Sequence, residues 1–259
     1  MTPRGGPIRE APSPNHDERP PGTPIDTLIL HYTGMRSAED AIARLRDPAS
    51  RVSCHYVVEE DGACWRLVPE GRRAWHAGVS HWRGHEVLNG RSVGIEVVNP
   101  GHEWGYRPFP AAQMAAVCDL ASGLLARHPI PARNVVAHSD VAPERKQDPG
   151  ELFDWQRLAR DGVGLWPRGV VDAGAGDVVR DAAGLAPVRA ALGRIGYRVA
   201  PRGASGDESA ADPDGDPDAA LAAVLRAFQR HWRPEGVTGE ADAGTRARLF
   251  AVARLVNGA

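Results

Sequence analysis

The sequence predicts an α/β protein with a mixed central β-sheet flanked by helices, followed by a second, small three-helix domain. Short β-prone runs alternate with helical segments over residues 25–167, a pattern typical of one mixed α/β domain. Three helical stretches then follow over residues 185–259. Between them, residues 168–184 are mostly Gly, Ala, Asp and Val with little periodicity, and we expect a linker there. Residues 1–24, rich in Pro, Arg and Gly, predict an extended N-terminal arm.

The expected strands of the first domain are short and end at polar residues or turns. Ser37 and Asp40 have the spacing of an N-terminal cap, which predicts a short helix ending near Arg46. Asp61 and Gly62 predict the turn of a hairpin. The strands are expected at residues 27–30, 54–58, 64–68, 92–98 and 134–137.

The clearest helix of the first domain begins at Pro110, and its apolar residues recur at a spacing of three to four. Cys118 lies on this apolar stripe, so we expect it to fill the core. In the small domain, helices are expected at 188–195, around the stripe that begins at Leu221, and at 242–256, with a polar loop at 199–218.

Composition narrows the class of function. The formal net charge is −2, which gives no strong field toward nucleic acid. No apolar run is long enough for a membrane span, and three scattered cysteines favour neither a disulfide framework nor a cysteine-rich zinc site. The first residues contain no apolar export signal, so a cytoplasmic location is expected, or a periplasmic one if a signal has been removed.

Two histidines end strand-like runs and suggest a metal site. His31 follows the first strand, His138 follows the run at 134–137, and Asp148 lies ten residues after His138. Two imidazoles and a carboxylate would give zinc three ligands and leave a fourth position open, as in catalytic sites where bound water titrates near a pKa of about 7. Ten histidines offer many other pairs, and Asp140 competes with Asp148 for the carboxylate role.

Two further charged residues fit this chemistry. Glu96 interrupts a run that otherwise favours burial, where a carboxylate is costly unless it is hydrogen-bonded or used as an acid/base. Lys146 lies two residues before Asp148 and could stabilise an oxyanion. Each could instead be structural or merely solvated. Cys54 beside His55 is not a nucleophile–base pair, because strand neighbours point to opposite faces.

Five stretches, in order, resemble the zinc-dependent N-acetylmuramoyl-L-alanine amidases of the AmpD/AmiD type, which share a fold with peptidoglycan recognition proteins. The resemblance covers roughly residues 25–167. Its stretches are residues 28–33 (LILHYT), 53–56 (SCHY), 75–78 (WHAG), 92–96 (SVGIE) and 138–150 (HSDVAPERKQDPG).

The resemblance implies a role for each matching position. His31, His138 and Asp148 would bind Zn²⁺, which disfavours Asp140 as a ligand. Glu96 would be the catalytic acid/base and Lys146 the oxyanion stabiliser, while His55 would be structural. The residues expected to line the substrate cleft are Tyr32, Trp75, His76 and Asn99.

The small domain resembles a three-helix peptidoglycan-binding domain, through residues 192–197, 227–230 and 236–245. The expected function is therefore hydrolysis of the amide between N-acetylmuramic acid, or its anhydro form, and L-alanine in peptidoglycan fragments during wall recycling. A lytic amidase acting on intact wall, of periplasmic or phage type, is the alternative. A non-catalytic peptidoglycan-binding protein is a third hypothesis, although every ligand position holds a competent residue.

Overall fold

The computed structural model describes residues 6–170, 174–199 and 217–258, and most of the predicted polar loop at 199–218 lies outside these ranges. Its main sheet has the strand order β1-β5-β4-β9-β3-β10, in which only β4 and β5 are antiparallel. The predicted mixed α/β class is thereby confirmed. The strands of this sheet are β1 (Arg9–Glu10), β3 (Thr27–Tyr32), β4 (Tyr56–Val58), β5 (Cys64–Arg66), β9 (Ser92–Val97) and β10 (Val135–Ala137).

Two small two-stranded sheets flank the main one. They pair β2 (His16–Glu18) with β6 (Arg72–Ala74), and β7 (His81–Trp82) with β8 (His85–Glu86). The predicted N-terminal arm thus contributes β1 and β2 and lies against the first domain. Single turns of 3-10 helix connect the other elements at Pro48–Ser50, Leu88–Gly90 and Ala132–Asn134.

The helices of the first domain follow the capping signals in the sequence. Helix α1 (Ala38–Arg46) begins after Ser37, whose hydroxyl accepts the backbone N–H of Asp40, as predicted. Pro110 is the N-cap of α3 (Ala111–Arg127). The remaining helices are short: α2 (Gly101–Trp104), α4 (His138–Val141) and α5 (Trp155–Arg160).

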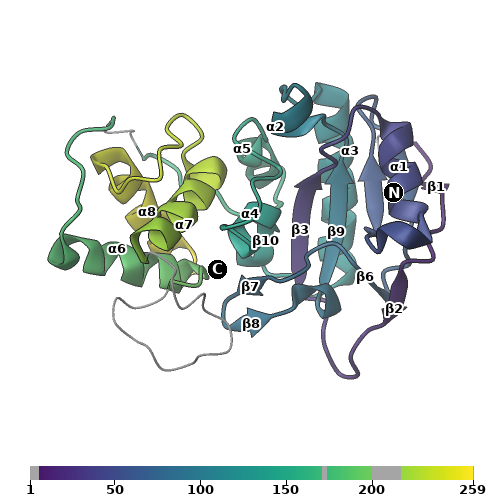
Figure 1. Ribbon diagram of the computed structural model, residues 1–259, viewed down its shortest axis with the longest axis horizontal. Helices are drawn as coiled ribbons and strands as arrows, with labels where there is room; N and C mark the ends of the chain where they lie inside the picture. Colours follow the sequence, from purple (N-terminus) through teal and green to yellow (C-terminus); the bar gives the residue numbers. More distant parts are fainter. Residues whose placement is uncertain (1–5, 171–173, 200–216, 259) are drawn as a thin grey trace.

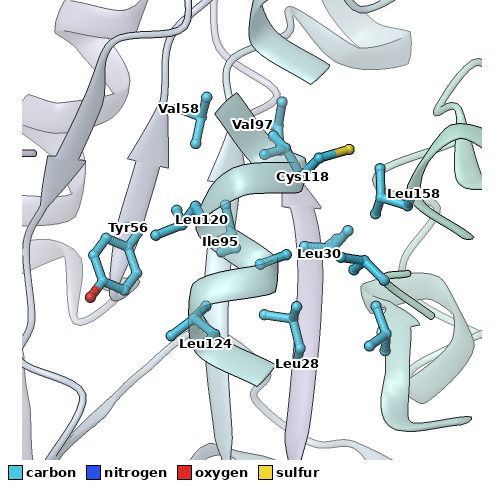
Figure 2. Close-up of a cluster of buried hydrophobic side chains, with 14 of the residues drawn as sticks. Leu28, Leu30, Tyr56, Val58, Ile95, Val97, Cys118, Leu120, Leu124 and Leu158 are labelled. Carbon is cyan, nitrogen blue, oxygen red and sulfur yellow. The ribbon is translucent and has the colours of Figure 1, made fainter. Parts of the chain in front are cut away.

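Helix α3 covers one face of the main sheet. Alternate strand residues such as Leu28, Leu30 and Ile95 point into a core beneath this helix (Figure 2). Cys118 is buried in the same core, as predicted. Because side chains alternate along a strand, Ile29 and His31 point to the opposite face, where the polar site lies.

The C-terminal unit consists of α6 (Ala182–Ile195), α7 (Pro217–Trp232) and α8 (Ala243–Leu255), which lie beyond β10 (Figure 1). Helix α6 begins six residues earlier than the sequence predicts, because Asp181 caps it by accepting the N–H of Gly184. The last helix begins after Asp242, which accepts the N–H of Thr245. Among the described residues, no helix combines the length and apolar character that a membrane span requires.

Candidate metal centre and cleft

Three adjacent parallel strands place the polar site at their carboxyl ends. His31 on β3 is in register with Glu96 on β9, so both side chains emerge on the same face. On the other side, Ala137 of β10 pairs with Leu30, and His138 follows it as the first residue of α4. The strand order β9-β3-β10 therefore brings Glu96, His31 and His138 together from distant parts of the chain.

His31, His138 and Asp148 converge on one point. Nδ1 of His31 lies 2.9 Å from Nδ1 of His138 and 3.2 Å from Oδ2 of Asp148. Nδ1 of His138 lies 3.0 Å from the same carboxylate oxygen. All three side chains are buried, with ligand atoms within 4.8 Å of one another. Among the described residues, these three side chains form the cluster of metal-binding side chains whose arrangement can hold a metal ion.

The outer nitrogen of each histidine shows which tautomer is present. Nε2 of His138 lies 3.3 Å from the carbonyl oxygen of Ala77, which can only accept a hydrogen bond. Nε2 therefore donates a hydrogen bond to this carbonyl, and Nδ1 is the ring nitrogen that faces His31 and Asp148.

A chain of hydrogen bonds fixes His31 in the same way. The Ser92 hydroxyl donates to the carbonyl of Leu88 at 2.7 Å, so its oxygen accepts from Nε2 of His76 at 3.2 Å. Burial, followed by the nearby imidazole of His31, lowers the pKa of His76 well below its ordinary value, so its ring is neutral. Nδ1 of His76 then accepts the proton on Nε2 of His31, 3.0 Å away. The lone pair on Nδ1 of His31 is thus directed at Nδ1 of His138 and the carboxylate of Asp148.

Two imidazole nitrogens and a carboxylate oxygen at these separations are placed to bind one cation between them. Burial lowers the pKa of His31 to about 4, which keeps that ring unprotonated at neutral pH. Burial alone would raise the pKa of Asp148, but His138 and His31 hold it well below its usual range. The donor set of two imidazoles and one carboxylate fits zinc with an open position.

Glu96 is a half-buried carboxyl group beside this centre. Burial raises the pKa of Glu96 well above its ordinary value, the charge of Asp148 adds to the effect, and Lys146 opposes it. Its Oε2 atom is buried and has no hydrogen-bond partner among the described residues. A carboxyl group whose pKa is raised in this way can both accept and return a proton, which suits general acid/base chemistry.

A cavity of about 370 Å³ opens over the centre. Lys146 and Gln147 line it from the loop before Asp148, and Met35, Leu45 and Val52 add apolar surface. Most residues that the sequence predicts for the site meet in this cavity: Tyr32, Trp75, His76, Glu96, His138, Lys146 and Asp148. His31 lies just beneath it and is 1% exposed.

One predicted cleft residue has a different position. Asn99 is buried and lies outside the residues that line the cavity. Its amide nitrogen donates to the carbonyl of Arg107 at 2.7 Å, and its amide oxygen accepts the N–H of Gly101 at 3.0 Å. Both polar groups of Asn99 are therefore engaged in holding the loop after β9, and its contact with substrate stays a prediction.

Three residues that the sequence analysis considered have hydrogen-bond partners elsewhere. None of these partners lies where the ligand atoms of the metal centre converge; the residues are Cys54, His55 and Asp140. The Cys54 thiol contacts the carbonyl of Tyr56, and burial raises its pKa well above the ordinary value. Nδ1 of His55 instead accepts the N–H of Gly94 at 3.0 Å, so these two residues form no nucleophile–base pair. Asp140 points away from the centre toward the C-terminal unit, where it contacts Tyr197 and His231.

Two residues important to the site were not predicted. Ser92 completes the hydrogen-bond chain behind His31, and its position two residues before Gly94 and four before Glu96 places it on their face of β9. Strand alternation could have identified it. Arg145 donates to the carbonyls of Ala77 and Val79, and so supports the segment whose Ala77 carbonyl accepts a hydrogen bond from His138. No local signal distinguishes this arginine from an exposed loop residue.

The sequence profile described as N-acetylmuramoyl-L-alanine amidase matches residues 21–151, which contain every residue of the centre. The chain belongs to this amidase family. It is 39% identical to the N-acetylmuramoyl-L-alanine amidase AmiD of Escherichia coli over 237 residues, covering 86% of this chain and 80% of that protein. It is 35% identical to the 1,6-anhydro-N-acetylmuramyl-L-alanine amidase AmpD of Enterobacter cloacae over 58% of this chain and 87% of that protein.

Solved structures extend the similarity across both units. The E. coli AmiD complex with anhydro-N-acetylmuramic acid-L-Ala-D-gamma-Glu-L-Lys aligns with a TM-score of 0.75 at 38% identity, covering 91% of each chain. AmpDh3 of Pseudomonas aeruginosa in complex with anhydromuramic pentapeptide aligns with a TM-score of 0.75 at 30% identity, over 92% of this chain and 95% of that one. The chain is thus an amidase that hydrolyses the bond between N-acetylmuramic acid and L-alanine in peptidoglycan fragments.

Proposed function

We propose that the amidase is zinc-dependent and acts on anhydro-N-acetylmuramoyl peptides, with His31, His138 and Asp148 as metal ligands. The observation that carries the proposal is the convergence of two Nδ1 atoms and one carboxylate oxygen on a single buried point. A bound zinc ion there supplies Lewis acidity to the scissile carbonyl and lowers the pKa of water.

Two residues beside the centre, Glu96 and Lys146, have different roles in hydrolysis. Glu96 accepts a proton from the attacking water, whose oxygen forms a bond to the lactyl carbonyl carbon. As the carbon–nitrogen bond breaks, the same carboxyl returns that proton to the departing L-alanine nitrogen. The raised pKa of Glu96 suits both halves of this transfer. The Lys146 ammonium, which lines the same cavity, stabilises the negative charge that develops on the carbonyl oxygen.

The cavity walls suit a muropeptide. Tyr32 and Trp75 offer partly exposed aromatic surface beside the centre, where sugar rings and the apolar parts of a peptide can pack. The solved relatives aligned over more than nine-tenths of this chain include complexes with anhydro-muramyl peptides. These similarities support the same class of ligand for this chain.

The C-terminal unit is proposed to bind peptidoglycan as a separate module. The support is its resemblance to three-helix peptidoglycan-binding domains. The residues of that resemblance serve the fold: the buried Gln229 side chain donates to Thr245 at 2.9 Å and accepts the N–H of Gly239 at 2.7 Å. These bonds join α7 to α8 and to the loop before α8, and we expect other side chains of the module to make its ligand contacts.

The principal test measures zinc and products in the full-length protein. We expect about one zinc per chain, loss of hydrolysis on chelation, and stoichiometric zinc to disappear in Asp148→Asn. Mass spectrometry should show free L-alanine peptides released from purified anhydro-muropeptides. Faster release from intact sacculi would favour the lytic alternative, and binding without cleavage would favour a non-catalytic protein. Full zinc occupancy in Asp148→Asn would remove the proposed ligand set.

The proposed wall-binding module needs a measurement that is independent of the cleft. The inactive variant Glu96→Gln can be sedimented with insoluble wall while soluble muropeptide saturates the cleft. Retention that persists under saturation supports a second binding site on the C-terminal unit. Complete release by the soluble competitor would show that all binding occurs through the cleft.

A further inference from the structure

One buried carboxylate joins the C-terminal unit to the metal centre. Asp140 is 1% exposed, and its Oδ1 atom accepts a hydrogen bond from the Tyr197 hydroxyl at 2.5 Å. Its Oδ2 atom lies 2.5 Å from Nδ1 of His231 and accepts the backbone N–H of Ala137 at 2.8 Å. Two of the three partners thus come from the C-terminal unit, 57 and 91 residues further along the chain.

Asp140 lies on helix α4. This helix contains the proposed ligand His138 and is hydrogen-bonded to the loop that carries the proposed ligand Asp148. Helix α4 contains four residues and begins with His138. The backbone N–H of Ser139 donates to the carbonyl of Asp148 at 3.0 Å, so α4 also fixes the position of that ligand. A single helical turn is too short to be stable by itself, because nucleation costs more than one turn of hydrogen bonds returns. Its geometry therefore depends on what holds Asp140.

The two C-terminal partners of Asp140 are themselves firmly packed. The ring of His231 stacks between those of Trp155 and Trp232, with centroids 3.8 and 4.0 Å away. The Tyr197 ring contacts Trp82 of the first domain edge to face, at 5.1 Å. Each aromatic side chain therefore has little freedom to move away from the carboxylate.

The apolar core continues across the same boundary. Ile29, Val136 and Val141 of the amidase domain belong to one buried cluster with Leu192 and Phe228 of the C-terminal helices. Ile29 is two residues from His31, and Val141 lies on α4 itself. The C-terminal helices thus pack directly behind the metal centre rather than extending from it on a tether.

From these contacts we infer that the C-terminal unit is a positioning element of the catalytic centre: Tyr197 and His231 hold Asp140, and Asp140 holds the turn that presents His138. This role goes beyond wall binding and rests on the proposed zinc site. It makes the zinc affinity of the amidase depend on two side chains that touch neither metal nor substrate.

The test removes the hydrogen bonds and keeps the rings. Tyr197→Phe deletes one hydroxyl, and His231→Phe keeps an aromatic ring between the two tryptophans. Arg198→Ala is the matched control. Its guanidinium also crosses the boundary, 3.0 Å from Glu86, but that pair is exposed and makes no hydrogen bond with Asp140. Zinc affinity is measured by competition with a chromogenic chelator, and backbone hydrogen exchange is measured in the metal-free full-length protein.

We expect zinc affinity to fall about tenfold in Tyr197→Phe and further in the double variant, since partners behind metal ligands commonly contribute about 10–100-fold. The amides of Ser139 and Ala142 on and beside α4 should exchange about tenfold faster, the effect of losing a hydrogen bond to a charged group. Arg198→Ala should change neither. If Tyr197→Phe folds and both its zinc affinity and its α4 exchange match the wild type, the inference is overturned.

The two proposals fail in different ways. A wild-type protein without measurable zinc affinity would refute the zinc centre, while hydrogen exchange in α4 would still decide whether Tyr197 and His231 hold this turn. Wild-type zinc binding with unaltered variants would retain the zinc centre and refute the positioning role. Tyr197→Phe alone suffices for this decision if His231→Phe does not fold.

Discussion

Replacing Gly94 by alanine should disturb the proposed metal centre without touching a proposed ligand. A Cβ atom at this position would lie 2.5 Å from Nδ1 and 2.6 Å from Cγ of His76, about 1 Å closer than ordinary contact. The backbone of Gly94 lies outside the left-handed region, so an alanine meets no conformational strain there. The substitution therefore tests the approach of the His76 ring alone.

The ring of His76 cannot move away at low cost. It is 9% exposed, and its two nitrogens hold His31 and Ser92. Overpacking a buried site costs about 1–3 kcal/mol, and displacement would also break the bond that directs the lone pair of His31. Since partners of metal-binding histidines commonly contribute about 10–100-fold to affinity, we expect zinc affinity in Gly94→Ala to fall by that factor.

The measurement combines chelator competition with urea unfolding of the metal-free protein. Gly193→Ala is the matched control, because Gly193 lies exposed on α6 and a Cβ there meets nothing within 4 Å. The control should be more stable than wild type by about 0.5–1 kcal/mol, since alanine is the better helix former. Wild-type zinc affinity together with wild-type stability in Gly94→Ala would refute the close approach of the His76 ring to Gly94.

Glu96→Gln should retain zinc and lose about 10²–10⁴-fold in turnover, measured on a soluble muropeptide. In the metal-free protein the raised pKa of Glu96 favours its neutral form, so the stability it contributes is complete below about pH 4.5 and is lost as pH rises through the folded pKa. Glu96→Gln should accordingly become more stable than wild type as pH increases, and equal pH dependence in urea unfolding would contradict the raised pKa. Lys146→Met should lower kcat about 10²-fold with zinc content unchanged, and a change confined to KM would assign Lys146 to substrate binding instead.

Local sequence patterns were sufficient for five of the six strands of the main sheet and for helices α1 and α3. The β-prone run at residues 92–98 predicts a strand, and the structure places β9 (Ser92–Val97) inside the sheet, between β4 and β3. The cap at Ser37 predicts where α1 begins, because its hydrogen bond to Asp40 spans only three residues. Such features are determined within a few residues, so a single sequence contains their cause.

The sequence predicted only part of the group His31, His138 and Asp148. The ends of two apolar runs showed where histidines would leave the sheet, but spacing left both Asp140 and Asp148 as candidates, and only the family resemblance favoured one. The structure separates them physically: Asp148 lies 3.0 Å from Nδ1 of His138, whereas Asp140 turns toward Tyr197 and His231. Residues two and ten positions from a histidine are equally plausible ligands until the fold of the intervening loop is known.

The tertiary structure alone decided which groups support the centre. His76 was expected to line the cleft, and it does so, but its nitrogens are committed to His31 and Ser92, 45 and 16 residues away in sequence. Asp140 meets its C-terminal partners 57 and 91 residues away. No periodicity or capping signal reports such pairs, because the free energy of a buried hydrogen bond depends on which strands and helices pack together rather than on the residues beside it in the chain.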